Sequence, residues 1–387
     1  MATTDISVSN EVDAALGWAR RAFAFQGNKI VSDHPWAKTV ELSSATSRAY
    51  LKIATPPAGG NSLGLIAEYL SPNVPPLMAS DPERGLFLHA DHMGEPVGRK
   101  PDTATKLSIL TTYASVQRKA LGHHDLIASL PQIHLDQIYD EFLQFLTPGG
   151  DDTPKLDSTV GIAHFLGRGS AQKYFDIFSS AEPLFRKFLA RGAGLQPAIN
   201  HCDLRPSNIA RRKDGAIVIL DWDDALAGPP GLSLHSLFRG CCRPLAALAD
   251  ILEAPKAEYR QSDRELLHAY VDQLCADGAY DAKVVLPALP AIICAGVLNY
   301  LLAFASYPVT ESSSRETIGK NMRRRLSDLM DVVQLLARDD RATAQNLADA
   351  FRRAGRDSRA GKVMKAHRQN SDVKPAAEIR FSTRSSN

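Results

Sequence analysis

The chain has 387 residues, of which 44% are hydrophobic and 23% are charged, with a formal net charge of +2. This composition is ordinary for a globular protein of one or two domains, and it excludes a strongly basic surface for nucleic acid. The five cysteines are odd in number and lack paired Cys-x-x-Cys spacing, so we expect reduced thiols in a cytoplasmic protein rather than disulfides or a zinc site.

The first hundred residues have the pattern of a small α+β lobe. The N-terminus has no basic segment followed by an apolar core, so we expect no secretory signal. A helix with Asn10 as its N-cap is predicted first, followed by two strands joined by a polar turn, a second helix and two short extended segments. In chain order these cover residues 10–24, 36–42, 49–53, 61–70, 74–78 and 85–90, and the lobe ends near residues 93–96.

Helical patterns dominate from residue 103 onward. Helices are predicted over residues 104–121, 135–146, 171–191 and 264–276, and apolar residues recur at helical spacing over 318–336. The exception lies between residues 197 and 224, where strands 209–212 and 216–220 form a predicted hairpin around Lys213-Asp214-Gly215. Beyond about Asp357 the chain is polar and basic, and we expect a disordered tail.

One uncharged stretch, residues 284–310, is long enough to span a bilayer. Pro287 and Pro290 lie near its start, Gly296 and Asn299 interrupt it, and no basic cluster flanks it closely. A helix buried in a large lobe is also apolar on every side. We therefore predict a buried helix and no membrane association.

The most informative segment is residues 201–224, HCDLRPSNIARRKDGAIVILDWDD. Phosphoryl transfer needs a carboxylate to accept the proton of the attacking hydroxyl, and hard oxygen ligands for Mg²⁺. Asp203 and Asn208 share one tight loop, and Asp221 ends the apolar strand that follows. The hairpin is expected to bring Asn208 and Asp221 together, which predicts a metal pocket beside Asp203.

The pattern His-x-Asp-x-x-x-x-Asn, followed by a strand and Asp221-Trp222, resembles the aminoglycoside phosphotransferase and choline kinase branch of the protein-kinase-like superfamily. The resemblance implies Asp203 as catalytic base, Asn208 and Asp221 as Mg²⁺ ligands, and His201 as a brace of the catalytic loop. Arg205 takes the place of a lysine near the transferring phosphate. Cys202 stands where many relatives have glycine, and we expect it to be structural.

The same resemblance assigns nucleotide contacts to the N-terminal lobe. Lys52 would grip the α- and β-phosphates and form an ion pair with Glu68 on the following helix. No GxGxxG loop precedes Lys52, so the turn with Ser43, Ser44 and Ser47 is expected to cover the phosphates. The backbone of the strand and hinge that contain His89, Ala90 and Asp91 would hold the adenine.

We therefore predict an α+β, bilobal protein-kinase-like fold with ATP and Mg²⁺ bound between the lobes. The predicted divisions are a helical extension (1–24), a nucleotide-binding lobe (25–96), a catalytic and substrate lobe (97–356) and the tail (357–387). The predicted reaction moves the γ-phosphate to a hydroxyl of a small molecule. Residues 231–330 contain eleven acidic and eleven basic residues, which does not favour a polycationic antibiotic as substrate. A pseudokinase that binds nucleotide without turnover, and nucleotidyl transfer on the same fold, remain alternatives.

Overall fold

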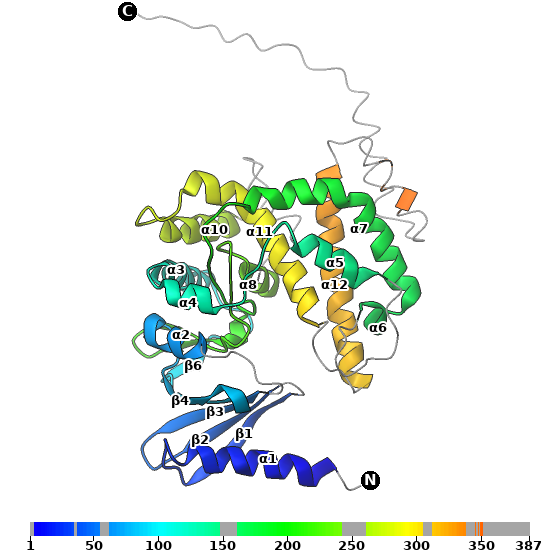
Figure 1. Ribbon diagram of the computed structural model, residues 1–387. Helices are drawn as coiled ribbons and strands as arrows, with labels where there is room; N and C mark the ends of the chain where they lie inside the picture. The colour runs from blue at the N-terminus through cyan, green and yellow to red at the C-terminus, as the bar shows by residue number, and fades with distance from the viewer. Residues whose placement is uncertain are drawn as a thin grey trace, which may run out of the picture.

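The computed structural model has two lobes, one built around a sheet and one that is mostly helical (Figure 1). It describes residues 4–34, 37–54, 62–147, 161–241, 261–304 and 312–337, together with residues 345, 347, 349 and 350. The predicted tail beyond Asp357 lies outside these residues. The predicted protein-kinase-like, α+β fold is confirmed.

The N-terminal lobe is an antiparallel five-stranded sheet in the order β1-β2-β3-β5-β4. Helix α1 lies across one face of this sheet (Figure 1), and apolar residues from both elements form a shared core around Val40, Leu51 and Leu88. Helix α2 packs on Phe87 of β5 and on the helical lobe. The elements are α1 (Thr4–Ala19), β1 (Gly27–His34), β2 (Ala37–Ser43), β3 (Arg48–Ala54), α2 (Ser62–Leu70), β4 (Leu77–Asp81) and β5 (Leu86–Ala90).

Among the described residues, two backbone contacts join the N-terminal lobe to the β8–β9 hairpin. Strand β6 (Gly94–Pro96), which follows β5, pairs antiparallel with β8 of the helical lobe. The loop between α2 and β4 makes the second contact, because the backbone N–H of Ile219 donates to the Asn73 carbonyl at 2.8 Å. The Asn73 amide also donates to the Ile217 carbonyl at 3.0 Å. Both contacts meet the hairpin that contains Asn208 and leads to Asp221.

The C-terminal lobe consists of helices around a small β structure. Its apolar core has two parts, one around α5, α7, α11 and α12, and one around α3, α10 and the β hairpin. The helices are α3 (Thr103–Leu121), α4 (His124–Ser129), α5 (Ile138–Leu146), α6 (Ala163–Leu166), α7 (Arg168–Leu189), α8 (Leu234–Cys241), α10 (Gln261–Leu274), α11 (Ala282–Ala303) and α12 (Ser312–Leu336). The strands are β7 (Ala198–Asn200), β8 (Ile209–Arg212), β9 (Ile217–Ile219) and β10 (Leu226–Gly228).

Helix α11 contains most of the uncharged stretch noted in the sequence. By length and composition it is the one helix in the described ranges that qualifies as a candidate membrane span. In the fold, 72% of its most apolar window is buried, and its residues contribute to both parts of the helical core. Its place in the core favours the buried-helix interpretation.

The largest differences from the predicted elements are at the N-terminus. Helix α1 begins at Thr4 and ends at Ala19, so Asn10 is inside the helix and the predicted cap is wrong. The helix ends early because the chain turns to place Phe25 against the sheet, where Arg20 lies over its ring. Strand β1 was not predicted, because it is an edge strand whose residues are mostly exposed and therefore lack an apolar alternation.

Candidate functional site

The predicted catalytic loop connects β7 to β8 and is held from inside the helical lobe. Asn200, at the end of β7, donates its amide N–H groups to three backbone carbonyls and accepts from Gln117 at 3.2 Å. Cys202 then turns the chain with a left-handed φ of 65°, and its backbone N–H donates to Ser233 Oγ at 3.0 Å. The loop that follows is therefore fixed at its first residues by fully buried polar groups.

Asp203, Arg205 and Asn208 lie together on this loop. The Asn208 amide donates to the Asp203 carbonyl oxygen at 3.0 Å and to its Oδ2 at 3.1 Å. Arg205 Nε lies 2.8 Å from the same carboxylate oxygen. Because the nitrogen of the Asn208 amide points at Asp203, its Oδ1 is left to accept, and it receives a 3.4 Å hydrogen bond from Ser207. This is the orientation that a cation ligand requires of an amide.

His201 is buried and joins the catalytic loop to the end of β9. Its Nε2 lies 2.6 Å from the Leu220 carbonyl oxygen, while Nδ1 accepts from the backbone N–H of Asp203 at 3.3 Å. Burial lowers the pKa of His201, although the Leu220 carbonyl opposes this shift. The neutral ring therefore donates on one side and accepts on the other. It has no free nitrogen for proton transfer, which fits a bracing role rather than a reacting one.

Asp221 follows the buried strand β9 and adopts a left-handed φ of 65°. The backbone N–H of Leu220 donates to the Asn208 carbonyl at 2.8 Å, so the residue before Asp221 is bonded directly to Asn208. The hairpin thus brings the end of β9 to the catalytic loop. The Asp221 side chain is 40% exposed, which leaves it accessible to a ligand.

Lys52 crosses from the N-terminal lobe to this acidic segment. Its ammonium forms ion pairs with Asp221 and, at 2.6 Å, with Asp223. Burial alone would lower the pKa of Lys52, but the charges of Asp223 and Asp221 outweigh it and the net shift is upward. Burial would likewise raise the pKa of Asp221, yet the Lys52 cation keeps that pKa below its ordinary value. These opposite shifts indicate a fully ionised pair between the lobes.

The predicted ion pair between Lys52 and Glu68 does not form in the part of the chain that the structure describes. Glu68 is exposed on α2, whose buried side chains are Ser62, Leu63, Ile66 and Leu70. A residue two positions from Ile66 is rotated by about 200° around a helix, which directs Glu68 away from that face. Asp223 occupies the position beside Lys52 that was predicted for Glu68.

The predicted phosphate-covering turn between β2 and β3 is closed by its own serines. The backbone N–H of Ser47 donates to the Ser44 hydroxyl at 3.0 Å, and the hydroxyl oxygens of Ser44 and Ser47 are 2.8 Å apart. Ser43 is the last residue of β2, and its carbonyl accepts from the Gln26 N–H at 2.9 Å. Contact of these serines with phosphate stays a prediction.

The predicted hinge follows β5. His89 and Ala90 end this strand, and the Ala90 N–H donates to the Pro76 carbonyl at 2.9 Å. The Asp91 side chain bonds Arg48 at 3.0 Å and the Met93 N–H at 2.9 Å. The backbone N–H of the next residue, His92, has no partner among the described residues. His89 lies close enough to Lys52 and Asp221 for their charges to act on its ring.

Asp223 and Asp224 add two carboxylates whose role the sequence left open. Burial raises the pKa of Asp224 to about 6, and the charges of Asp221 and Asp223 act in the same direction. Burial raises the pKa of Asp223 too, despite the pairing with Lys52. Within the described ranges, no set of three or more His, Cys, Asp or Glu side chains is arranged to hold a metal ion. Asn208 and Asp221 would need phosphate and water oxygens to complete a Mg²⁺ shell.

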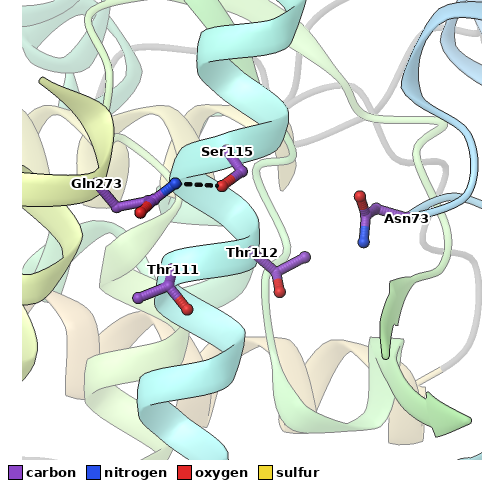
Figure 2. Close-up of a pocket in the computed structure, with 5 residues that line it drawn as sticks. All are labelled: Asn73, Thr111, Thr112, Ser115 and Gln273. Atoms are coloured by element: carbon purple, nitrogen blue, oxygen red, sulfur yellow. Dashed lines mark hydrogen bonds between the residues drawn. The ribbon is translucent and has the colours of Figure 1, made fainter. Parts of the chain in front are cut away.

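A separate polar pocket of about 290 Å³ lies between α3, α10 and the α2–β4 loop. Figure 2 shows Asn73 on one side, facing Thr111, Thr112 and Ser115 of α3, with Gln273 bonded to Ser115 at 2.8 Å. Its lining groups are hydroxyls and amides without charge. None of the predicted site residues lines it, so it is distinct from the catalytic loop.

The comparisons with known proteins agree with this geometry. The model of the phosphotransferase enzyme family (APH) matches residues 162–270, a range that includes the catalytic loop and Asp221. A search of curated proteins by sequence found no significant match. The match and the shared fold confirm the resemblance to this family and support a small-molecule phosphotransferase.

Solved structures with this fold include kinases of small alcohols. The choline kinase from Cryptosporidium parvum Iowa II is 12% identical, with a TM-score of 0.54 over 83% of this chain and 96% of its own. The Plasmodium vivax ethanolamine kinase is 11% identical, with a TM-score of 0.53 over 82% and 88%. The choline kinase LicA from Streptococcus pneumoniae is 10% identical, with a TM-score of 0.51 over 82% and 99%. At these identities the likeness establishes the fold.

Proposed function

We propose that this chain, which matches the phosphotransferase enzyme family, is an ATP- and Mg²⁺-dependent kinase that phosphorylates a hydroxyl of a small molecule. The observation that carries the proposal is the convergence of four groups from distant segments. Asp203 and Asn208 are hydrogen-bonded to each other, Leu220 is bonded to Asn208, and Lys52 pairs with Asp221 from the opposite lobe. In-line phosphoryl transfer needs such a carboxylate, cation and metal-ligand set.

Asp203 is the proposed acceptor of the proton from the attacking hydroxyl. Its side chain is 21% exposed, so one face remains open to an incoming alcohol. The Asn208 amide and the Arg205 guanidinium both contact Oδ2, which leaves Oδ1 as the oxygen available to the hydroxyl. Arg205 is also proposed to place a positive charge near the transferring phosphate, where it would neutralise negative charge.

Asn208 Oδ1 and the Asp221 carboxylate are the proposed Mg²⁺ ligands. Both are hard oxygen donors, and the hairpin contact between Leu220 and Asn208 brings them together. When bound with the nucleotide, Mg²⁺ would neutralise charge on the phosphates. Lys52 forms ion pairs with Asp221 and Asp223, and we propose that it turns to the α- and β-phosphates when nucleotide binds.

A buried histidine nitrogen without a hydrogen-bond partner lies at the proposed nucleotide site. Nδ1 of His89 is buried without a hydrogen-bond partner in the described part of the chain. The His89 side chain lies on the same face of the sheet as Lys52, and His89 directly precedes the proposed hinge of Ala90 and Asp91. A buried polar atom of this kind is costly unless a ligand satisfies it, so the residues present fit a bound purine.

The acceptor is proposed to be a neutral or singly charged metabolite, and the enzyme to act in the cytoplasm without nucleic-acid or membrane partners. Net charge near zero and balanced charges in residues 231–330 support this choice. The described thiols of Cys202, Cys275 and Cys294 are free, in keeping with a reducing compartment.

The test is a screen for ADP release with hydroxylated metabolites, choline, ethanolamine and aminoglycosides. Wild type and Asp203→Asn are compared at fixed Mg·ATP, and products are identified by mass spectrometry. A phosphorylated product that requires Asp203 supports the kinase. A product that carries a nucleotidyl group would instead show that the enzyme is a nucleotidyltransferase. Nucleotide binding with no turnover on any acceptor would favour the pseudokinase.

A further inference from the structure

His89 and Lys52 project from the same face of the N-terminal sheet. In the antiparallel pair of β3 and β5, Lys52 lies opposite Phe87 and Tyr50 lies opposite His89. Residues opposite each other, and residues two apart on one strand, share a face. Leu51 and Leu88 point the other way, into the core with α1. His89 therefore stands between Lys52 and the proposed hinge.

The hydrogen bonds of the ring determine which nitrogen holds the proton. The Pro75 carbonyl acts on the His89 ring in the direction expected of a hydrogen-bond acceptor, while Nδ1 has no partner among the described residues. A proton on Nε2 would face that carbonyl and leave Nδ1 as an acceptor. Burial and the neighbouring Lys52 charge lower the pKa of His89 to about 4. The ring is neutral near pH 7, and Nδ1 presents a lone pair with nothing to accept from.

We propose that Nδ1 of His89 accepts a hydrogen bond from the exocyclic amino group of adenine and so selects ATP over GTP. This inference rests on the proposed function, because it needs a purine at the hinge. Adenine presents an N–H donor at position 6, whereas guanine presents an oxygen there. An oxygen facing Nδ1 would place two acceptors against each other, with no proton between them.

The fixed tautomer gives this contact its discriminating power. With the proton on Nε2, on the side of the Pro75 carbonyl, the ring cannot simply offer Nδ1–H to a guanine oxygen. Nδ1 is also shielded from solvent, and water does not readily substitute for the missing partner. Sites built to hydrogen-bond a ligand group reject the analogue that lacks it more strongly than apolar pockets reject size differences.

The test measures nucleotide affinity by isothermal titration calorimetry, independently of turnover. ATP, GTP and purine riboside triphosphate, which lacks the amino group, are titrated in Mg²⁺ into wild type, His89→Leu and His89→Gln. Wild type is expected to bind ATP at least tenfold more tightly than either analogue, the effect of one buried hydrogen bond. His89→Leu removes the acceptor and should reduce the ratios to about threefold or less. His89→Gln offers an amide oxygen to adenine or, after rotation of the amide, an N–H to guanine, so it should keep a preference for ATP over purine riboside triphosphate but lose most of the preference over GTP.

Two results would overturn the assignment while leaving the kinase proposal in place. One is wild type that binds ATP and purine riboside triphosphate equally, a comparison that depends on no variant. The other is an unchanged ATP-to-GTP ratio in a folded His89→Leu protein, with folding judged by its thermal melt. Wild type that binds none of the three nucleotides would overturn the proposed function as well.

Discussion

His201 donates from Nε2 to the Leu220 carbonyl oxygen across 2.6 Å. This bond links the residue two before Asp203 to the residue immediately before Asp221. The ring also packs edge-on against Trp222, with centroids 4.7 Å apart. The buried imidazole therefore joins the segment of the proposed base to that of the proposed metal ligand, in addition to the bond between Leu220 and Asn208.

Replacing this imidazole tests that dependence. In His201→Ala, the Leu220 carbonyl loses its side-chain partner and a cavity forms beside Trp222, while the Asp203 N–H keeps only its bond to the backbone carbonyl of residue 201. We expect the free energy of unfolding to fall by about 3 kcal/mol, measured by urea denaturation. The exposed His124 on α4 provides the control, and His124→Ala should change stability by less than about 0.5 kcal/mol. Equal stability of the two variants would contradict the bracing role.

Asp203→Asn should keep the fold and lose turnover. The amide cannot accept the hydroxyl proton, so we expect kcat to fall by about 10²- to 10⁴-fold with an unchanged thermal melt. The matched control is Asp214→Asn, on the exposed hairpin turn, and this variant should retain full activity. A folded Asp203→Asn enzyme with near wild-type kcat would exclude Asp203 as the base.

Lys52→Met should strengthen the response to Mg²⁺ alone. Without nucleotide the Lys52 ammonium occupies the space between Asp221 and Asp223, where it competes with a divalent cation. Removal leaves both carboxylates unpaired, so MgCl₂ should raise the melting temperature of the variant more than that of wild type. Lys38→Met, which breaks the ion pair with Asp33 on the same sheet, is the control. If MgCl₂ raises the melting temperatures of Lys52→Met and wild type by the same amount, Lys52 does not compete with Mg²⁺.

Asp224→Asn should stabilise the protein near neutral pH. Burial raises the folded-state pKa of Asp224 to about 6, above the ordinary aspartate value of 3.8. The folded state therefore binds this proton more tightly than the unfolded state, and wild type gains stability as pH falls from about 7 toward 4. The amide that replaces the Asp224 carboxylate is uncharged at every pH, so the variant avoids the free-energy cost of burying a charged carboxylate. In EDTA we expect Asp224→Asn to melt higher than wild type at pH 7.5, with the gap closing toward pH 5. A gap that does not depend on pH would show that the buried charge of Asp224 is not the cause.

The sequence predicted well those parts of the site that depend on short-range geometry. Asn208 and the end of β9 are joined by a hairpin of a few residues, so spacing alone brings them together. The chain order of strands and helices likewise follows local apolar patterns. These features need no knowledge of contacts between distant segments, whereas the bilobal protein-kinase-like fold was predicted from the family resemblance of residues 201–224.

Contacts between distant segments were not predictable in the same way. The pairing of Lys52 with Asp223 depends on how the lobes meet, and the face of α2 that is buried decides where Glu68 points. The bond from Tyr113 to Ser233, 2.7 Å long, joins residues 120 positions apart beneath the catalytic loop. No signal in either local sequence identifies this partner. Strand β1 escaped prediction for another reason, since its exposed residues carry no apolar pattern.

The attachment of the α2–β4 loop to β9 through Asn73 has a mechanical consequence. Together with the pairing of β6 and β8, it tethers the smaller lobe to the hairpin at two places. Helix α2 packs on the helical lobe beside these two attachments, so backbone contacts and apolar packing together fix the hairpin against the small lobe. Lys52, in contrast, reaches Asp221 only through its long side chain, which can change its direction while both backbones keep their places.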